Sequence, residues 1–354
     1  MSEFLSSRLK NLKPYTPGEQ PRIKNLIKLN TNESPFSPSP KALELAGEAA
    51  KDLELYPDPE CKELTGLIAE KFGVDFENVL VTNGSDEILN FAFMAFCDEN
   101  REAVFPDITY GFYKVFANLH GVPYREIPLN EDLGINLGDY ANLKAVAFIA
   151  NPNAPTGKYH KVREIEKLIS ENPESLFVID EAYIDFGNES AVPLVKKYDN
   201  ILVTQTFSKS RSMAGARLGF GVGSKALIDA MNMIKYSTNP YNINKMTMAA
   251  GIGALKDEEY TKENCLEICK NREYTMDELK SIGFLMTESK ANFIFVKHPE
   301  ISGQRIYQGL RDRNILVRHF DGERIKDYNR VTIGTKAQMD KFLDAIREIL
   351  KGEE

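Results

Sequence analysis

The sequence has no tryptophan and only four cysteines and four histidines among its 354 residues. Four cysteines are too few for a disulfide-rich secreted fold. Cys265 and Cys269 lie four apart, but no histidine is near them to complete a zinc site, so no bound metal is expected. The first residues lack the apolar core of a signal peptide. The longest apolar run, residues 88–96, contains Asn90 and is too short to span a membrane. A cytoplasmic protein without a membrane partner is therefore expected.

Positive charge is also scarce, since 44 lysines and arginines face 52 aspartates and glutamates, which gives a net charge of −8. This balance disfavours a broad basic surface for nucleic acid, so no nucleic-acid partner is expected. The hydrophobic fraction of 42% and the charged fraction of 27% are those of an ordinary globular protein. A chain of this length predicts about two domains.

Short apolar runs bounded by polar turns occupy the middle of the chain, at residues 79–81, 145–150, 176–179 and 201–203. Runs of this length are typical of strands that are buried on both faces. Between two of them, Ile165, Leu168 and Ile169 recur at helical spacing. The alternation predicts an α/β fold with a mostly parallel sheet covered by helices.

The last hundred residues have a different pattern. A long charged helix is expected at about 257–281, followed by a strand at 293–296, a helix, strands at 315–318 and 330–333, and a final helix to about residue 350. We expect three parts: an N-terminal arm at 1–40 rather than a core element, a large domain at 41–250 and a smaller α+β domain at 251–354.

Polar residues follow the predicted strands, where ligands of open parallel sheets bind. After the first run, Gly84 permits a tight turn, and Ser85 and Asp86 open a helix whose free N–H groups can bind an anion. Asp180 and Lys209 follow two other strands. Taken singly, Ser85 could simply cap the helix and the two charges could be solvated loop residues. Opposite charges at one sheet edge make that alternative less attractive.

Two nucleotide-binding hypotheses fail on particular residues. The alternate glycines at 219–223 lack the spacing of a dinucleotide fingerprint. Residues 155–158, Pro-Thr-Gly-Lys, are similar to a phosphate loop. However, Pro152 stands where such a loop needs glycine, and Tyr159 stands where it needs serine or threonine.

The polar residues together match the needs of pyridoxal 5′-phosphate. A lysine such as Lys209 can form a Schiff base with the aldehyde, and Asp180 can hold the protonated pyridine nitrogen. The helix N-terminus can hold the phosphate together with Ser208 and Arg217. A lysine has an ordinary pKa near ~10.4, so burial and a cationic neighbour must lower it before the amine can act as a base.

The segment Thr206-Phe207-Ser208-Lys209, followed by residues 214–219, resembles the cofactor-lysine segment of the fold-type I aminotransferases. Residues 151–157 and 180–183 match the same family in order and separation. Within it, the chain resembles the histidinol-phosphate aminotransferases most closely, through residues 12–18, 28–35, 56–58 and 330–335. The resemblance spans essentially the whole chain and implies a fold-type I pyridoxal-phosphate-dependent transferase.

The resemblance implies a role for each matching residue. Lys209 would be the Schiff-base lysine and proton shuttle, Asp180 would pair with the pyridine nitrogen, and Tyr183 would touch the ring hydroxyl. The phosphate would be bound by Ser85, Asp86, Thr206, Ser208 and Arg217, and by Tyr56 of a neighbouring subunit, while Tyr110 would stack on the ring. The substrate would be faced by Tyr15, Asn32, Arg330 and Arg318. A homodimer with shared active sites follows, with the arm packed on the small domain and on the partner.

One position departs from the family pattern. The family usually has asparagine directly before Pro-Thr-Gly, where it bonds the ring hydroxyl, but this chain has Ala154. Asn153 or Asn151 could replace it, or Tyr183 could carry that bond alone. We assign the role to Asn153.

The implied reaction converts L-histidinol phosphate and 2-oxoglutarate into imidazole-acetol phosphate and L-glutamate, a step of histidine biosynthesis. Two relatives of the same fold stay open as alternatives, an aromatic-amino-acid aminotransferase and a threonine-phosphate decarboxylase. A pyridoxal-phosphate-binding transcriptional regulator is disfavoured, because it needs a further DNA-binding domain and only an arm precedes the large domain.

Overall fold

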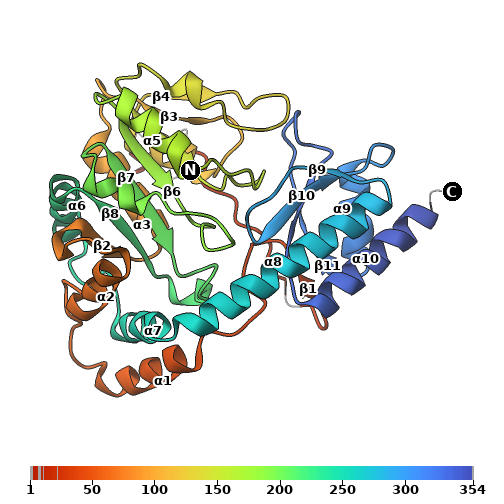
Figure 1. The fold of residues 1–354 in the computed structure, drawn as a ribbon, viewed down its shortest axis with the longest axis horizontal. Helices are drawn as coiled ribbons and strands as arrows, with labels where there is room; N and C mark the ends of the chain where they lie inside the picture. Colours follow the sequence, from red (N-terminus) through yellow and green to blue (C-terminus); the bar gives the residue numbers. More distant parts are fainter. Residues whose placement is uncertain (1–2, 7–8, 11, 22, 353–354) are drawn as a thin grey trace.

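The structure is a computed structural model that describes residues 3–6, 9–10, 12–21 and 23–352. Residues 1, 2, 7, 8, 11 and 22 of the predicted arm, and 353–354 of the predicted C-terminal domain, lie outside the described residues. Within the described chain, a large sheet with its helices lies beside a smaller α/β unit (Figure 1).

The large sheet has seven strands in the order β2-β8-β7-β6-β5-β3-β4. Strand β8 is antiparallel to both of its neighbours, and the pairs from β7 to β4 are parallel. The bounds are β2 Val79–Thr82, β3 Ala103–Pro106, β4 Tyr124–Ile127, β5 Val146–Ala150, β6 Leu176–Asp180, β7 Ile201–Thr206 and β8 Gly219–Gly223. The predicted mostly parallel sheet is confirmed, although β3, β4 and β8 were not predicted.

Helices cover both faces of this sheet, because side chains of a strand point alternately to opposite faces. Val146 and Phe148 of β5 pack in the cluster that contains α3, α4 and α6, and Ala147 and Ile149 pack in the cluster that contains α2, α5 and α7. The helices are α1 Pro40–Ala49, α2 Lys62–Phe72, α3 Ser85–Phe96, α4 Phe112–His120, α5 Val162–Glu171, α6 Lys225–Thr238 and α7 Lys245–Leu255. Short 3₁₀ turns are η2 Ala50–Asp52, η3 Phe76–Asn78, η4 Leu137–Tyr140, η5 Val192–Lys196 and η6 Ala214–Ala216.

The smaller unit contains an antiparallel sheet in the order β12-β13-β10-β9 and has its own core. Its elements are β9 Leu285–Met286, β10 Phe293–Lys297, α9 Gly303–Asp312, β11 Ile315–Leu316, β12 Arg318–His319, β13 Asn329–Thr332 and α10 Lys336–Lys351. The long helix α8, Glu258–Ser281, runs from the side of α7 into this unit (Figure 1). It corresponds to the long charged helix expected at 257–281. No described helix is both long and apolar enough to cross a membrane.

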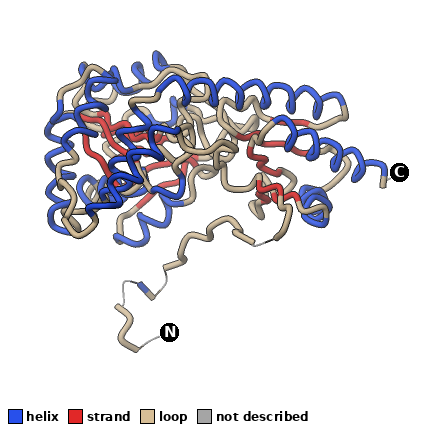
Figure 2. Tube along the Cα trace, turned by 90° about the horizontal axis from the view of Figure 1, so that it is seen from below, coloured by secondary structure: helices blue, strands red, loops and turns tan. Residues whose placement is uncertain are grey.

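The N-terminal segment is only partly an arm. Residues 12–21 have no regular secondary structure and run along the outside of the molecule (Figure 2), where Tyr15 stacks on Phe112 and Glu19 accepts from Tyr307. In contrast, β1, Ile27–Lys28, pairs in parallel with β11, and Leu29 is buried in the core of the smaller unit. The expectation that the first 40 residues stay outside the core is therefore wrong for this part. The expected domain boundary near residue 250 falls inside α7, and the domain limits stay a prediction.

Candidate active site

Most of the predicted site residues meet in one cavity at the carboxyl edge of the large sheet. Asp180 is the last residue of β6, Lys209 follows β7, and α3 begins directly after β2 and its turn. The predicted residues that line the cavity are Ser85, Asp86, Tyr110, Asp180, Tyr183, Thr206, Ser208, Lys209 and Arg217. Because the carboxyl ends of neighbouring parallel strands lie together, residues far apart in sequence converge here.

The start of α3 forms a cradle that admits no extra side chain. The residue that caps the helix is Gly84, with φ 78°. The alternative that Ser85 serves only as the helix cap is therefore wrong. A Cβ on Gly84 would lie 2.5 Å from Arg217 Nη2, and a Cβ on Gly219 would lie 2.3 Å from the backbone nitrogen of Ser85. The first N–H groups of a helix have no partner inside it. With Ser208, whose Oγ accepts from Arg217 Nη1 over 3.3 Å, this donor set suits a phosphate.

The carboxylate of Asp86 is already occupied by two neighbours. Tyr110 Oη donates to its Oδ1 over 2.7 Å, and Arg217 Nη2 donates to its Oδ2 over 2.9 Å. The side chain therefore fixes the aromatic ring and the guanidinium. The contribution of Asp86 to an anion is that of its backbone N–H.

Asp180 is buried, with 4% of its surface exposed. Its Oδ2 accepts a hydrogen bond from Tyr113 Oη over 2.9 Å, and its Oδ1 accepts from the backbone N–H of Ala182 over 3.2 Å. Burial raises the pKa of Asp180 to about 6, the Tyr113 bond and Lys209 lower it, and Asp86 raises it. A cation placed beside this carboxylate would favour its charged form.

Lys209 lines the cavity together with a second cationic side chain, Arg217. Its Nζ donates to the backbone oxygen of Thr31 over 3.1 Å and lies 5.9 Å from the ring centre of Tyr183. Burial, with the charge of Arg330, lowers the pKa of Lys209 to about 8, while Glu33 raises it. The lowered lysine pKa expected from the sequence is found, and burial is its largest cause.

Asn32 acts on Tyr183 rather than lining the cavity. Its Nδ2 donates to Tyr183 Oη over 2.9 Å, and its Oδ1 accepts from Thr332 Oγ1 over 3.1 Å. Because the tyrosine oxygen accepts from Asn32, its own proton remains available for the cavity. This bond fixes the Tyr183 hydroxyl, and the predicted substrate contact of Asn32 stays a prediction.

The structure does not favour Asn153 as the partner of a ring hydroxyl. Its Nδ2 donates to Ile108 O over 3.0 Å and to Thr156 Oγ1 over 3.1 Å, and its Oδ1 accepts from Thr109 Oγ1 over 2.7 Å. The Nδ2 of Asn151 donates to the backbone oxygen of His160, and its Oδ1 accepts from the backbone N–H of His160. The turn uses both amides for its own shape, and the partner of the ring hydroxyl stays a prediction.

Arg330 is a guanidinium without a carboxylate partner among the described residues. Its Nη2 donates to Asn30 O over 3.0 Å, and its buried Nε has no partner. It lies against the rings of Phe293 and Phe320, at 5.3 and 5.8 Å from their centres. Burial lowers the pKa of this group, and so does the neighbouring Arg318. Arg330 does not line the cavity itself, but its charge acts on Lys209, and its orphaned buried donor is suited to an anionic group of a substrate.

The other two predicted substrate residues, Tyr15 and Arg318, lie in different surroundings. Tyr15 stacks on Phe112 at 4.3 Å and lies 6.3 Å from the ring of Tyr110, which lines the cavity, but Tyr15 itself does not line it. Arg318 Nη2 instead reaches Thr16 O over 3.4 Å, and Arg318 lines a separate hollow with Glu19. The predicted substrate contact of Arg318 is therefore not favoured by its position.

Tyr56 lies on the surface of the chain, with 80% of its surface exposed. Its ring stacks on Tyr241 with 4.6 Å between the ring centres, and it does not line the cavity of its own chain. Its expected contact with a neighbouring subunit stays a prediction.

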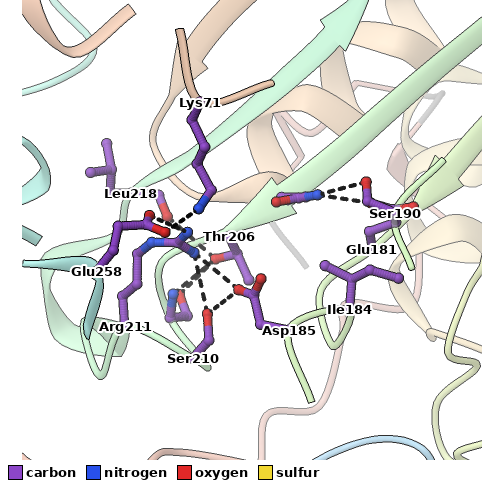
Figure 3. A network of polar contacts seen from close by, with 12 residues as sticks. Lys71, Glu181, Ile184, Asp185, Ser190, Thr206, Ser210, Arg211, Leu218 and Glu258 are labelled. Atoms are coloured by element: carbon purple, nitrogen blue, oxygen red, sulfur yellow. Dashed lines mark hydrogen bonds and ion pairs between the residues drawn. The ribbon is translucent and has the colours of Figure 1, made fainter. Parts of the chain in front are cut away.

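Arg211, two residues after Lys209, is buried outside the cavity. Its Nη1 donates to Asp185 Oδ2 over 3.0 Å, and its Nη2 lies 3.6 Å from Glu258 Oε1 at the start of α8 (Figure 3). Lys71 pairs with the same Glu258. The network ties the loop that carries the cavity lysine to the helix that leads into the smaller unit.

Sequence reasoning assigned no site role to Tyr113, Thr31 or Glu33, which all act on the site. Tyr113 lies three residues after Tyr110, which was a usable signal, because residues at that spacing share a side of a helical turn. Thr31 contributes a backbone oxygen, which no side-chain pattern could have revealed.

Comparison with known proteins agrees with this geometry. Residues 24–346 match the family described as aminotransferase class I and II. A histidinol-phosphate aminotransferase of Brachyspira hyodysenteriae is 48% identical over 353 residues, which cover 99% of this chain and 100% of that protein. The crystal structure of the histidinol-phosphate aminotransferase from Clostridium acetobutylicum is 26% identical, with a TM-score of 0.85 over 92% of this chain and 100% of that chain. A Sinorhizobium meliloti histidinol-phosphate aminotransferase in complex with pyridoxal-5′-phosphate shares the fold. It is 24% identical, with a TM-score of 0.85 over 93% of this chain and 92% of that chain.

Proposed function

The chain belongs to the class I and II aminotransferases, and we propose that within this family it transfers the amino group of L-histidinol phosphate to 2-oxoglutarate. The products are imidazole-acetol phosphate and L-glutamate, so the enzyme serves histidine biosynthesis. Its cofactor is pyridoxal 5′-phosphate, which supplies an aldehyde and an electron-withdrawing ring when bound.

The residues of the cavity fit this cofactor. The N-terminus of α3, with Thr206, Ser208 and Arg217, would hold the phosphate, because every one of these groups presents donors. Asp180 would hold the pyridine nitrogen, and Tyr183 would donate to the ring hydroxyl in place of the predicted Asn153. Tyr110 would cover the ring.

Lys209 would hold the aldehyde between turnovers and move the proton during them. Its amine lies beside the Tyr183 ring, and its lowered pKa leaves a substantial part of it neutral near pH 8. A neutral amine can accept the proton of the substrate α-carbon and return it to the cofactor carbon.

The observation that carries the substrate proposal is the buried guanidinium of Arg330, whose Nε has no hydrogen-bond partner and which has no carboxylate partner among the described residues. Histidinol phosphate has a phosphate ester where an amino acid would have its α-carboxylate. An arginine fork can bond either group in a bidentate manner, but a dianion benefits more from the charge. The high identity to histidinol-phosphate aminotransferases supports the same substrate.

We expect kcat/KM for L-histidinol phosphate with 2-oxoglutarate to exceed that for phenylalanine or tyrosine by at least about tenfold, or about 1.4 kcal/mol of transition-state binding. L-Histidinol phosphate and the two aromatic amino acids are assayed side by side with the same enzyme preparation. An equal or reversed preference would favour the aromatic aminotransferase, and release of carbon dioxide from threonine phosphate would favour the decarboxylase.

The variant Arg330→Met tests the proposed role of Arg330 in the same assay. It should lower kcat/KM for L-histidinol phosphate far more than it changes the affinity for the cofactor. Arg313→Met is the matched control, because Arg313 lies in the same unit and pairs with Glu348 on the surface. A control variant that lost as much activity as Arg330→Met would contradict the assignment.

The proposal includes a homodimer in which Tyr56 of each subunit reaches the phosphate of its neighbour. The exposure of Tyr56 and of the nearby Leu53 and Leu55, at 80%, 55% and 62%, supports such a contact. A cytoplasmic location is also proposed, and the four free cysteines support it, because reducing compartments keep thiols free.

A further inference from the structure

Tyr113 of α4 is a buried polar side chain that contacts Asp180 from behind the cavity. It is 0% exposed and does not line the cavity, yet its hydroxyl donates to Asp180 Oδ2 over 2.9 Å. Its ring is held by Phe105, Phe148 and Tyr110, whose ring centres lie 5.9, 5.6 and 5.8 Å away. Packing on several sides leaves the hydroxyl little freedom to turn away from the carboxylate.

The surroundings of Asp180 make this bond important. Burial and Asp86 of α3 both disfavour its charged form. The groups that favour the charged form are Tyr113, the backbone N–H of Ala182 and the ammonium of Lys209. Lys209 must lose its charge to react, and its contribution then disappears. Among the described residues, Tyr113 is then the one side chain that hydrogen-bonds this carboxylate.

We propose that Tyr113 is a positioning residue, whose hydroxyl keeps Asp180 ionised and fixes its carboxylate where the pyridine nitrogen of the cofactor is held. The inference rests on the proposed use of pyridoxal 5′-phosphate. A neutral donor bonded to a carboxylate stabilises its charged form, and charge-assisted bonds are stronger than neutral ones. The phenol itself stays protonated, because burial and the adjacent Asp180 raise the pKa of Tyr113 well above its ordinary value.

Another buried tyrosine provides a matched control. Tyr140 of η4 is also 0% exposed and belongs to the core of the same sheet, but its hydroxyl has no partner among the described residues. Tyr113→Phe and Tyr140→Phe therefore remove the same atom from two buried rings. Only the first removes a hydrogen bond to a carboxylate of the cavity.

The experiment measures the affinity of the apoprotein for pyridoxal 5′-phosphate by absorbance titration between pH 6 and pH 9, without substrate. Loss of the Tyr113 hydroxyl raises the pKa of Asp180 above its value of about 6, so near pH 6.5 a larger fraction of the variant carries a neutral Asp180. We expect Tyr113→Phe to bind about tenfold more weakly at pH 6.5 and to approach the parent at pH 9. Lys209 titrates in the same pH range in the parent and in Tyr113→Phe. Its effect therefore cancels when the cofactor affinities of the two proteins are divided. Tyr140→Phe should match the parent throughout.

The Asp180→Asn background separates a positioning role from a structural one. There the additional Tyr113→Phe change should produce no pH-dependent loss, because the group through which Tyr113 acts no longer titrates. A Tyr113→Phe protein with a lower melting temperature but a parent-like pH dependence would overturn the inference, as would a pH-dependent loss that persists in the Asp180→Asn background. Failure of the parent itself to bind the cofactor would overturn the proposed function instead.

Discussion

Replacement of Lys209 by alanine should lower the rate of amino transfer by at least about 10³-fold and leave the protein folded. The reason is that one amine has two tasks, holding the aldehyde and carrying the proton. Its Nζ is fixed by the backbone oxygen of Thr31 and lies against Tyr183, and the structure places no second described lysine in the lining of the cavity.

The measurement is the rate of a single turnover with saturating cofactor, so that weaker cofactor binding does not enter. Lys158→Ala is the control, since Lys158 pairs with Asp132 outside the cavity lining. Thermal unfolding of both variants checks the fold. Turnover of the Lys209→Ala protein within tenfold of the parent would refute the assignment.

Asp180→Asn should keep the cofactor at saturating concentration and lose about 10²-fold or more of the turnover. The carboxylate is buried and its pKa is raised to about 6, so a protonated pyridine nitrogen beside it would form an ion pair with a carboxylate that water hardly reaches. A neutral amide accepts a hydrogen bond but cannot stabilise that charge. The ring would then withdraw electrons less strongly from the substrate α-carbon.

The spectrum of the bound cofactor and the turnover rate are measured on the same sample. Asp185→Asn is the matched control, because Asp185 carries a carboxylate close in sequence that binds Arg211 outside the cavity. If Asp180→Asn turned over like the parent while Asp185→Asn did not, the roles assigned to the two aspartates would be wrong.

The central strands and their polar ends could be predicted because each depends on local sequence. Each of β5, β6 and β7 contains a continuous apolar run; Asp180 ends β6, and Lys209 lies three residues after the end of β7. Strand β4, in contrast, contains two exposed charged residues, Arg125 and Glu126, and the glycine-rich β8 has little side-chain signal at all. Both strands are formed by pairing with neighbours rather than by their own propensity.

The contacts that complete the site depend on pairs of residues distant in sequence. Tyr113 reaches Asp180 across 67 positions, and Asn32 reaches Tyr183 across 151. No periodicity along the chain encodes such a pair. The bonds of the Asn153 amide have a similar cause, because its partners Ile108 and Thr109 lie on a loop whose approach only the folded sheet defines.

The most direct test of the account is to locate the bound cofactor. The holoenzyme is treated with borohydride, which reduces the carbon–nitrogen double bond between a lysine and the cofactor aldehyde to a stable single bond, and the peptides are mapped by mass. The account predicts one labelled peptide with the adduct on Lys209, which lines the cavity together with Asp180. An adduct on any other lysine, or no adduct from protein saturated with the cofactor, would contradict it.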